Sequence, residues 1–444
     1  MTNTDTFHAA ELKMLGEIWS SPTLWPTMRV LCDDCNGRFV ASDDERRAAA
    51  FICDSLAKYG LANAHTEEFP VQGWRRGDAH LIVNGQPLVC IGLPGTPPCD
   101  LQAPIILLGN GEPADFEKAG EAARGKIAIV LGKGSHRLEK YARAIQAGCV
   151  AFIFGNTELG TLPPTGSIEV HGQPAPIPGI GIAHESFLRI GRMAEAGELT
   201  ARLKVAAELF PASGLNVIAD IPGTDPGQGI LMACGHYDGH DIAQGAVDNA
   251  SGTAAVMEAA RALMTVRDQL KLGIRIALWS GEEVGMIGSG AYARSHKDEL
   301  SKVKLVFNCD IVSNPGPMFI GLSGYDTERV AEFMRALAGK EYNVNVVNGV
   351  TIPYSDHFSF NQHGVPALMA ATGEPKYPNL GPHTYGDTLD KVDMRALRSS
   401  AAFTARVLLN LAHDPAPLPA RIATRDEVRE TLRKAGYEDL MLKD

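Results

Sequence analysis

The sequence contains no apolar run approaching the roughly 20 residues that a membrane-spanning helix needs. It has no block of lysine or arginine, and its formal net charge is −11 at pH 7, so a surface for binding nucleic acid is not expected. The N-terminus, MTNTDTFHAAELKMLGEIW, lacks both a basic leader and an apolar core and does not resemble a signal peptide. We therefore expect a cytoplasmic protein with neither a nucleic-acid nor a membrane partner.

Cysteine is also scarce, with eight residues in a chain of 444. A disulfide scaffold is therefore excluded, and free thiols are expected. Cys32 and Cys35 form a CxxC pattern in LCDDCNGR, but no second Cys/His pair lies at zinc-finger spacing. The role of this pair stays open.

The length of the chain predicts more than one domain. Residues 43–60 have the acidic start, apolar spacing and final glycine of an amphipathic helix. Residues 78–212 contain short β-like runs separated by Gly and Pro, which is typical of a small β-rich module. Residues 213–413 alternate apolar strands with amphipathic helices, which predicts an α/β domain whose sheet is covered on both faces. A charged helical tail follows at 414–444.

Charged side chains follow each candidate strand of the second half. LMACG leads into His236 and Asp238, IRIALWSG into Glu282 and Glu283, KLVFNC into Asp310, and GPHTYGD later supplies His383 and Asp387. The loop GHYDGHDIAQGAVDNASG adds Asp248 and is far richer in acids and histidines than a turn requires. Because active sites in such folds form beyond the carboxyl ends of the strands, we expect these side chains to lie together.

So many carboxylates at one sheet edge would repel one another and would have raised pKa values unless a cation lay among them. No Lys or Arg is interleaved in these segments, so divalent metal ions are the expected neutralising charges. Mixed imidazole and carboxylate ligands suit Zn²⁺, with Mn²⁺ or Co²⁺ as substitutes. Two ions sharing one carboxylate would leave a bridging water that is a hydroxide near neutral pH.

Six motifs carry a resemblance to a known family. HYD, GAVDNASG, EEVGMIGS, the Asp that ends FNCD, YSDHFSF and HTYGDT occur in the order seen in the M28 (aminopeptidase Y/glutamate carboxypeptidase-like) zinc metallopeptidases, over about 210–413. The stretch GKIAIVLGKG…KYARAIQAGCVAFIFGN resembles a protease-associated (PA) domain, which several branches of that family contain as an insertion. The resemblance implies a phosphorylase/hydrolase-like three-layer α/β/α mixed-sheet domain built from 1–77 and 213–413. The PA-like domain, at 78–212, would form a lid or wall of the substrate cleft.

The resemblance also implies two Zn²⁺ ions and assigns their ligands: His236 and Asp310 for one ion, Glu283 and His383 for the other, and Asp248 bridging both. Glu282, next to a ligand but not one itself, would be the general base. Relatives often have a cis peptide after the bridging aspartate, so a cis bond is expected at Asp248–Asn249.

Several further side chains have supporting roles in this hypothesis. Asp238 would accept the second ring N–H of His236, and Tyr354 would donate a hydrogen bond to the oxyanion, as a tyrosine does in some relatives. Ser251 is expected to cap the following helix, and Asp387 to orient the His383 loop or the neighbouring helix. Asp356 and His357 are expected to brace their loop. Residues expected in turns or at the surface are His240, Asp241, His296 and His363.

The resulting prediction is hydrolysis of a peptide or small amide, by default as an aminopeptidase-type exopeptidase. A carboxypeptidase acting on acidic dipeptides would need arginines for a carboxylate; Arg38, Arg275 and Arg294 are present, but their locations are open. An amidase for a non-peptide amide also stays open. A binding scaffold without activity would have substitutions at ligand positions, and the sequence has none there. The inserted module argues against a single-zinc cyclising acyltransferase. A homodimer is common in this architecture.

Overall fold

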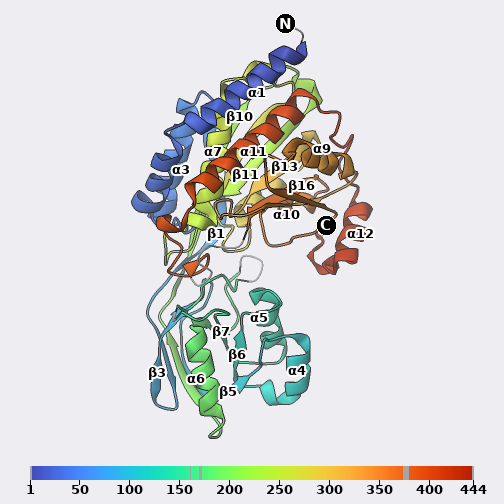
Figure 1. Ribbon diagram of the computed structural model, residues 1–444. Coiled ribbons are helices and arrows are strands. Elements are labelled where there is room, and N and C mark those ends of the chain that lie inside the picture. The colour runs from blue at the N-terminus through green and yellow to red at the C-terminus, as the bar shows by residue number, and fades with distance from the viewer. Residues whose placement is uncertain (1–2, 161, 170–172, 374–379, 443–444) are drawn as a thin grey trace.

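The computed structural model describes residues 3–160, 162–169, 173–373 and 380–442. Its strands form two eight-stranded sheets, which lie one above the other in Figure 1 and have separate sets of helices. The upper sheet of that view, here called the main sheet, holds the strands that lead into the predicted site. The lower one, here called the small-domain sheet, belongs to the β-rich module.

The main sheet has the strand order β1-β10-β12-β11-β13-β16-β14-β15. Its centre, β12-β11-β13-β16, is parallel, whereas β10 is antiparallel to β12 and β14 is antiparallel to β16. The predicted mixed sheet is therefore confirmed. In chain order its strands are β1 (Ala62–Arg75), β10 (Glu208–Ile221), β11 (Ile230–His236), β12 (Gly273–Trp279), β13 (Val303–Cys309), β14 (Met318–Ser323), β15 (Val344–Asn348) and β16 (Ala367–Thr372).

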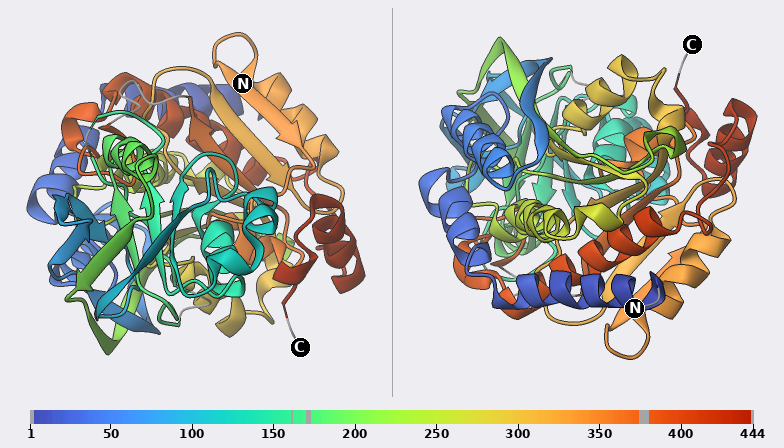
Figure 2. Two further views of the ribbon diagram at one scale, coloured as in Figure 1. Left: turned by 90° about the horizontal axis from the view of Figure 1, so that it is seen from below. Right: turned by 90° about the horizontal axis from the view of Figure 1, so that it is seen from above.

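Helices cover both faces of the main sheet (Figure 2). Along β11, Leu231 and Ala233 belong to one apolar cluster, and Met232 and Cys234 belong to another, as the alternation of side chains along a strand requires. The first cluster is closed by α1 (Asn3–Ser20), α2 (Leu24–Arg29), α3 (Asp43–Lys58), α7 (Ser251–Met264), α9 (Glu328–Ala338) and α11 (Met394–His413). The second is closed by α8 (Ile287–Ser295) and α10 (His357–Asn361). This is the predicted three-layer α/β/α arrangement.

The helix α7 lies deepest, because its sequence, SGTAAVMEAARALM, is rich in small residues. A Cβ on Gly252 would lie 2.3 Å from the carbonyl oxygen of Cys309, so only glycine lets the helix begin this close to β13. The C-terminal helix α12 (Arg425–Ala435) packs separately, with Val428 and Leu432 against Phe358. None of the helices in the described ranges is both long and apolar enough to cross a bilayer.

The small-domain sheet has the order β3-β2-β9-β5-β6-β7-β8-β4. Its strands are β2 (Ala79–Val83), β3 (Gln86–Leu88), β4 (Cys90–Gly92), β5 (Cys99–Leu107), β6 (Ile127–Leu131), β7 (Ala151–Gly155), β8 (Gly179–Ile182) and β9 (Thr200–Val205). The helices of this domain are α4 (Pro113–Ala119), α5 (Arg137–Gln146) and α6 (His184–Ala194). The strand-rich character that the sequence predicts for this region is thus present.

The two domains are joined by the long antiparallel pair β1 and β10, which passes from one to the other (Figure 1). The boundary predicted at 77/78 lies just beyond β1, whereas the one predicted at 212/213 falls inside β10. One apolar cluster includes small-domain residues together with Phe39, Val40 and Val284. The small domain is therefore packed against the segment that carries Glu282 and Glu283 rather than tethered by a flexible linker.

Candidate metal centre

The carboxyl ends of the central parallel strands bring the predicted ligands together. His236 is the last residue of β11, Asp310 directly follows β13, and Glu283 lies in the turn after β12. Asp248 lies in the loop before α7, in a segment whose Asp248–Asn249 peptide bond is cis, as the sequence predicts. All four of these side chains are buried.

The ligand atoms form two groups that share Asp248. In the first, His236 Nε2 lies 3.2 Å from Asp248 Oδ1 and 3.5 Å from Asp310 Oδ1. In the second, His383 Nε2 lies 3.3 Å from Asp248 Oδ2 and 3.3 Å from Glu283 Oε2. Asp248 therefore presents one carboxylate oxygen to each imidazole, which is the arrangement of a bridging ligand.

These separations fit divalent ions. Ligand bonds of about 2.0–2.1 Å at tetrahedral angles place neighbouring ligand atoms about 3.4 Å apart. Each group offers three ligand atoms within 4.8 Å of one another, from His236, Asp248 and Asp310 and from His240, Glu283 and His383. Asp310 Oδ1 is buried without a hydrogen-bond partner among the described residues, which is costly unless a cation contacts it. Two zinc ions are thus compatible with the donor set.

The charges of the centre are strongly coupled. Burial opposes ionisation of Asp248, yet the imidazoles of His236 and His383 hold its pKa far below the ordinary range. Burial and the charge of Asp248 raise the pKa of Glu283 to about 8. Burial also raises the pKa of Glu282 well above its usual value. Bound dications would offset this excess of negative charge.

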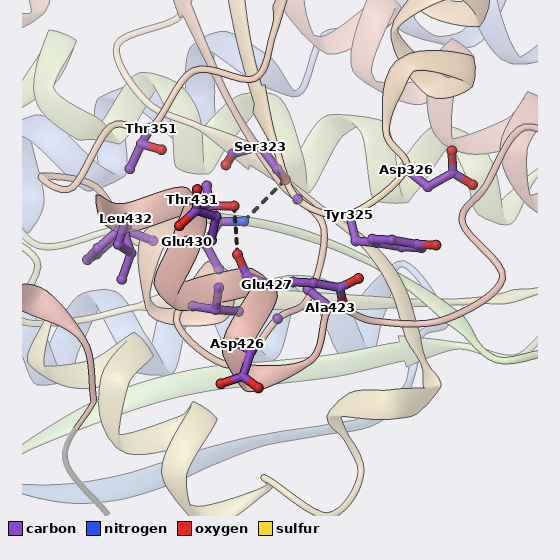
Figure 3. A pocket seen from close by; sticks show the side chains of 15 residues that line it. Ser323, Tyr325, Asp326, Thr351, Ala423, Asp426, Glu427, Glu430, Thr431 and Leu432 are labelled. Carbon is purple, nitrogen blue, oxygen red and sulfur yellow. Dashed lines mark hydrogen bonds between the residues drawn. The ribbon is translucent and has the colours of Figure 1, made fainter. Parts of the chain in front are cut away.

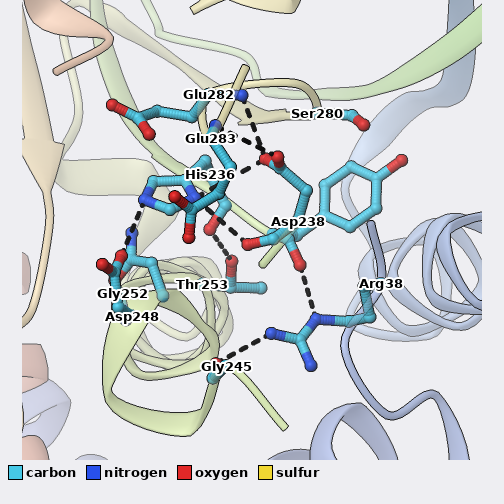
Figure 4. Close-up of polar contacts among 12 residues, drawn as sticks. Arg38, His236, Asp238, Gly245, Asp248, Gly252, Thr253, Ser280, Glu282 and Glu283 are labelled. Atoms are coloured by element: carbon cyan, nitrogen blue, oxygen red, sulfur yellow. Dashed lines mark hydrogen bonds and ion pairs between the residues drawn. The ribbon is translucent and has the colours of Figure 1, made fainter. Parts of the chain in front are cut away.

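Asp238 braces the centre from behind (Figure 4). Its carboxylate accepts the backbone N–H groups of Glu282 at 3.2 Å and Glu283 at 3.3 Å. The Nδ1 of His236 lies 3.5 Å from Asp238 Oδ1 and 3.1 Å from the Asp238 carbonyl oxygen. The same residue therefore fixes both the histidine and the turn that carries the two glutamates.

Asp387 holds the backbone of Asp248, the proposed bridging ligand, in the way that Asp238 holds the turn of the two glutamates. It accepts the backbone N–H groups of Val247 at 2.7 Å and Asp248 at 3.1 Å, so it orients the loop that leads into α7. The prediction for Ser251 is wrong: α7 has Ala250 at its N-cap. The Ser251 hydroxyl instead donates to the carbonyl of Val247 at 2.8 Å, because the residue already lies inside the helix.

Tyr354 is engaged with the small domain. Its hydroxyl donates to Glu139 Oε1 at 2.8 Å, and its ring stacks on His136 with centroids 3.9 Å apart. The hydroxyl that the sequence assigns to the oxyanion is therefore held by α5 in this structure. Asp356 and His357, predicted to brace the same loop, are fully buried.

His240 lies at the start of a turn, as expected, since the N–H of Ala243 donates to its carbonyl at 3.4 Å. It is not at the surface, however: it is 4% exposed, and its Nε2 lies 2.8 Å from Glu283 Oε2. Its position four residues after His236 was the available signal, but the surrounding glycines and aspartates suggested a turn. Asp241, His296 and His363 are half-buried, and Asp241 forms an ion pair with Arg76 at 2.6 Å.

The candidate carboxylate-binding arginines have other partners or are exposed. Arg38 is fully buried and donates to the carbonyls of Leu31, Asn36, Tyr237, Gln244 and Gly245. Arg275 binds Asp220 and the hydroxyl of Tyr292, and Arg294 is exposed. The small domain instead supplies contacts at the centre: the N–H of Thr165 donates to the carbonyl of His383 at 2.8 Å.

A cavity of about 510 Å³ lies away from this centre, between α12 and the end of β14 (Figure 3). Its apolar side includes Phe358 and Leu432, and its carboxylates include Glu427 and Glu430. These two acids already form ion pairs with Arg421 and Arg433. None of the predicted ligands lines this cavity.

The sequence of residues 216–408 matches the model of peptidase family M28, and residues 87–190 match the PA domain. Carboxypeptidase Q of Bos taurus is 26% identical over 398 residues, covering 86% of this chain and 83% of that protein. The probable leucine aminopeptidase 2 of Aspergillus fumigatus is 26% identical over 416 residues, covering 87% and 81%. The crystal structure of a peptidase M28 precursor from Shewanella amazonensis has the same fold, with a TM-score of 0.81 at 23% identity, covering 95% and 100%. Residues 216–408 therefore form a peptidase family M28 region, and a PA domain matched at 87–190 precedes it in the chain.

Proposed function

We propose that this metal-dependent peptidase is a two-zinc exopeptidase that releases the N-terminal residue of short peptides. The observation that carries the proposal is the placement of Asp248, whose two oxygens lie 3.2 Å and 3.3 Å from the Nε2 atoms of His236 and His383. Glu282 belongs to the same turn as the expected ligand Glu283 and makes none of the ligand contacts described above. A general base beside two ions that share one carboxylate ligand is an arrangement suited to amide hydrolysis.

Two zinc ions, when bound, would acidify a water molecule and polarise the scissile carbonyl. Glu282 takes a proton from the attacking water on its carboxylate and delivers it to the nitrogen of the leaving amine. Asp238 keeps Glu282 in position through the backbone N–H of that residue.

Metal analysis combined with a base variant tests this function. Dialysis against a chelator should abolish hydrolysis of aminoacyl p-nitroanilides, and Zn²⁺ should restore it. Glu282→Gln should lower kcat by about 10²–10⁴-fold while the protein retains two zinc ions per chain. Glu299→Gln, at a side chain 55% exposed, is the matched control. Full activity in Glu282→Gln, or in the metal-free protein, would contradict the proposal.

A carboxypeptidase is the second candidate, because the small domain places Arg137 near the centre. Burial lowers the pKa of this guanidinium, whereas the charges of Glu283 and Glu282 raise it, so the guanidinium lies within electrostatic reach of the turn that carries both glutamates. Its Nε donates to the Ser167 carbonyl at 2.9 Å. Within the described residues neither Nη atom of Arg137 forms a hydrogen bond. The two NH₂ groups of this guanidinium could therefore bind a carboxylate.

Peptides with free and amidated C-termini separate the two candidates. An aminopeptidase should hydrolyse both forms at similar kcat/KM. Recognition of a carboxylate by Arg137 predicts a preference for the free form, which Arg137→Met should reduce by about 10- to 150-fold, the range of a charged hydrogen bond. Arg192→Met, at an exposed position of α6, is the control.

The cytoplasmic location and the homodimer stay predictions. Light scattering of the purified protein would test the homodimer.

A further inference from the structure

His240 and His383 converge on one carboxylate oxygen. His240 Nε2 lies 2.8 Å from Glu283 Oε2, and His383 Nε2 lies 3.3 Å from the same atom. The two rings meet at 81° with their centroids 4.7 Å apart. Two imidazoles from separate loops therefore point to a common volume beside an expected metal ligand.

The contact of His240 with Glu283 is not a hydrogen bond. Both ring nitrogens of His240 are buried, and in the described part of the chain neither has a hydrogen-bond partner, although Nε2 is close enough to Oε2 for one. Leaving a buried polar group without a partner is costly. Ligands of one metal ion show this geometry, since each lone pair points at the ion and not at the neighbouring ligand.

We propose that His240 is a sixth protein ligand of the centre and binds the second ion together with Glu283, His383 and Asp248. This inference rests on the proposed two-metal function and adds to the ligand set that the family resemblance implies. The second site then has two imidazoles, whereas the site of His236 and Asp310 has one. Because imidazole favours Zn²⁺ and carboxylate tolerates Mn²⁺, the two sites differ in metal preference.

The loop that carries His240 is held rigidly, as a ligand loop should be. Asp241 forms a two-point ion pair with Arg76 at 2.6 and 2.8 Å. Arg38 binds the carbonyls of Tyr237 and Gln244, on either side of His240. A Cβ on Gly37 would lie 2.4 Å from the carbonyl oxygen of His240, so the N-terminal segment packs directly against its backbone.

Zinc titration of the full-length apoprotein against a competing chelator tests the proposal. His240→Phe removes the ring nitrogens but keeps a ring against Phe39, on which His240 stacks at 6.4 Å. We expect two binding steps in the wild type and at least a tenfold loss of affinity in one step of the variant. His296→Phe is the matched control, because that ring also stacks, at 4.2 Å on Tyr292, and is half-buried.

Spectroscopy distinguishes a ligand from a brace. In the Co²⁺-substituted protein, loss of a ligand nitrogen should change the visible d–d absorption of one site. X-ray absorption of the wild-type zinc protein should count three imidazoles per two ions, a readout that does not depend on whether His240→Phe folds. Wild-type affinity in the variant, an unchanged cobalt spectrum, or two imidazoles per two ions would overturn the proposal. A wild type that binds fewer than two ions would refute the two-metal function itself.

Discussion

Replacing Asp387 tests whether the bridging ligand is positioned from a neighbouring loop. The side chain is 2% exposed, and its two oxygens accept the N–H groups of Val247 and Asp248. Asparagine has one carboxamide oxygen, so in Asp387→Asn one of these N–H groups would face an amide NH₂. We expect the loop to relax in the metal-free variant, so that binding of the ions must restore the bridging geometry. The variant is therefore expected to bind the metal ions less tightly than the wild type.

The magnitude follows from that single lost contact. A hydrogen bond to a charged group contributes about 1.5–3 kcal/mol, and tenfold in a binding constant corresponds to about 1.4 kcal/mol. Zinc affinity should therefore fall about 10- to 150-fold, similar to the effect of other groups that orient metal ligands. Both ions should be affected, because Asp248 faces both groups.

Zinc titration in the presence of a chelator measures this loss. Asp390→Asn is the control, since Asp390 lies in the same loop and its side chain is 72% exposed. Thermal unfolding with and without zinc provides a second readout, in which the stabilisation by zinc should shrink in Asp387→Asn. Unchanged affinity for both ions would show that Asp387 does not determine the position of Asp248.

Three further variants test residues outside the proposed ligand set. Arg38→Met leaves five carbonyl oxygens without their donor and should lower the free energy of unfolding by roughly 4 kcal/mol or more in urea titrations; a loss below about 1 kcal/mol would contradict this. Burial raises the pKa of Glu169 from 4.5 to about 8, so the folded protein holds this proton more tightly than the unfolded chain and loses stability as pH rises through that range. In Glu169→Gln this loss, at most about 5 kcal/mol, should disappear from the dependence of the melting temperature on pH, and an unchanged slope would refute it. Tyr354→Phe should reduce kcat less than about threefold because the hydroxyl binds Glu139, whereas a hundredfold loss would support the oxyanion role.

The convergence of the proposed ligands was predictable because it depends on local patterns. Apolar strands that run directly into His236, Glu283 and Asp310 mark the carboxyl edge of a parallel sheet, and such an edge gathers whatever follows its strands. A helix after the GAVDNASG loop was also predictable, although α7 begins at Ser251 itself and not after it.

The features that the sequence did not reveal depend on distant segments. GHDIAQG has the composition of a turn, and His240 is buried where distant residues such as Gly37 and Arg38 pack against that loop. β1 contains Pro and Gly and many polar residues, and it is a strand because it pairs with β10. Arg137 reaches the centre from another domain, which no periodicity within its own helix indicates.

The antiparallel pair β1 and β10 shows how the small domain is inserted into the catalytic fold. Arg75 and Glu208 are directly paired, so the chain leaves the catalytic fold and returns to it at adjacent points. In topological terms everything between them is an enlarged hairpin loop, and loop tips are where whole domains are inserted most readily. Thr165 and Arg137 arrive at the centre together with that loop. The proposed metal ligands therefore all stay on the main-sheet domain, while the inserted loop adds only neighbouring residues.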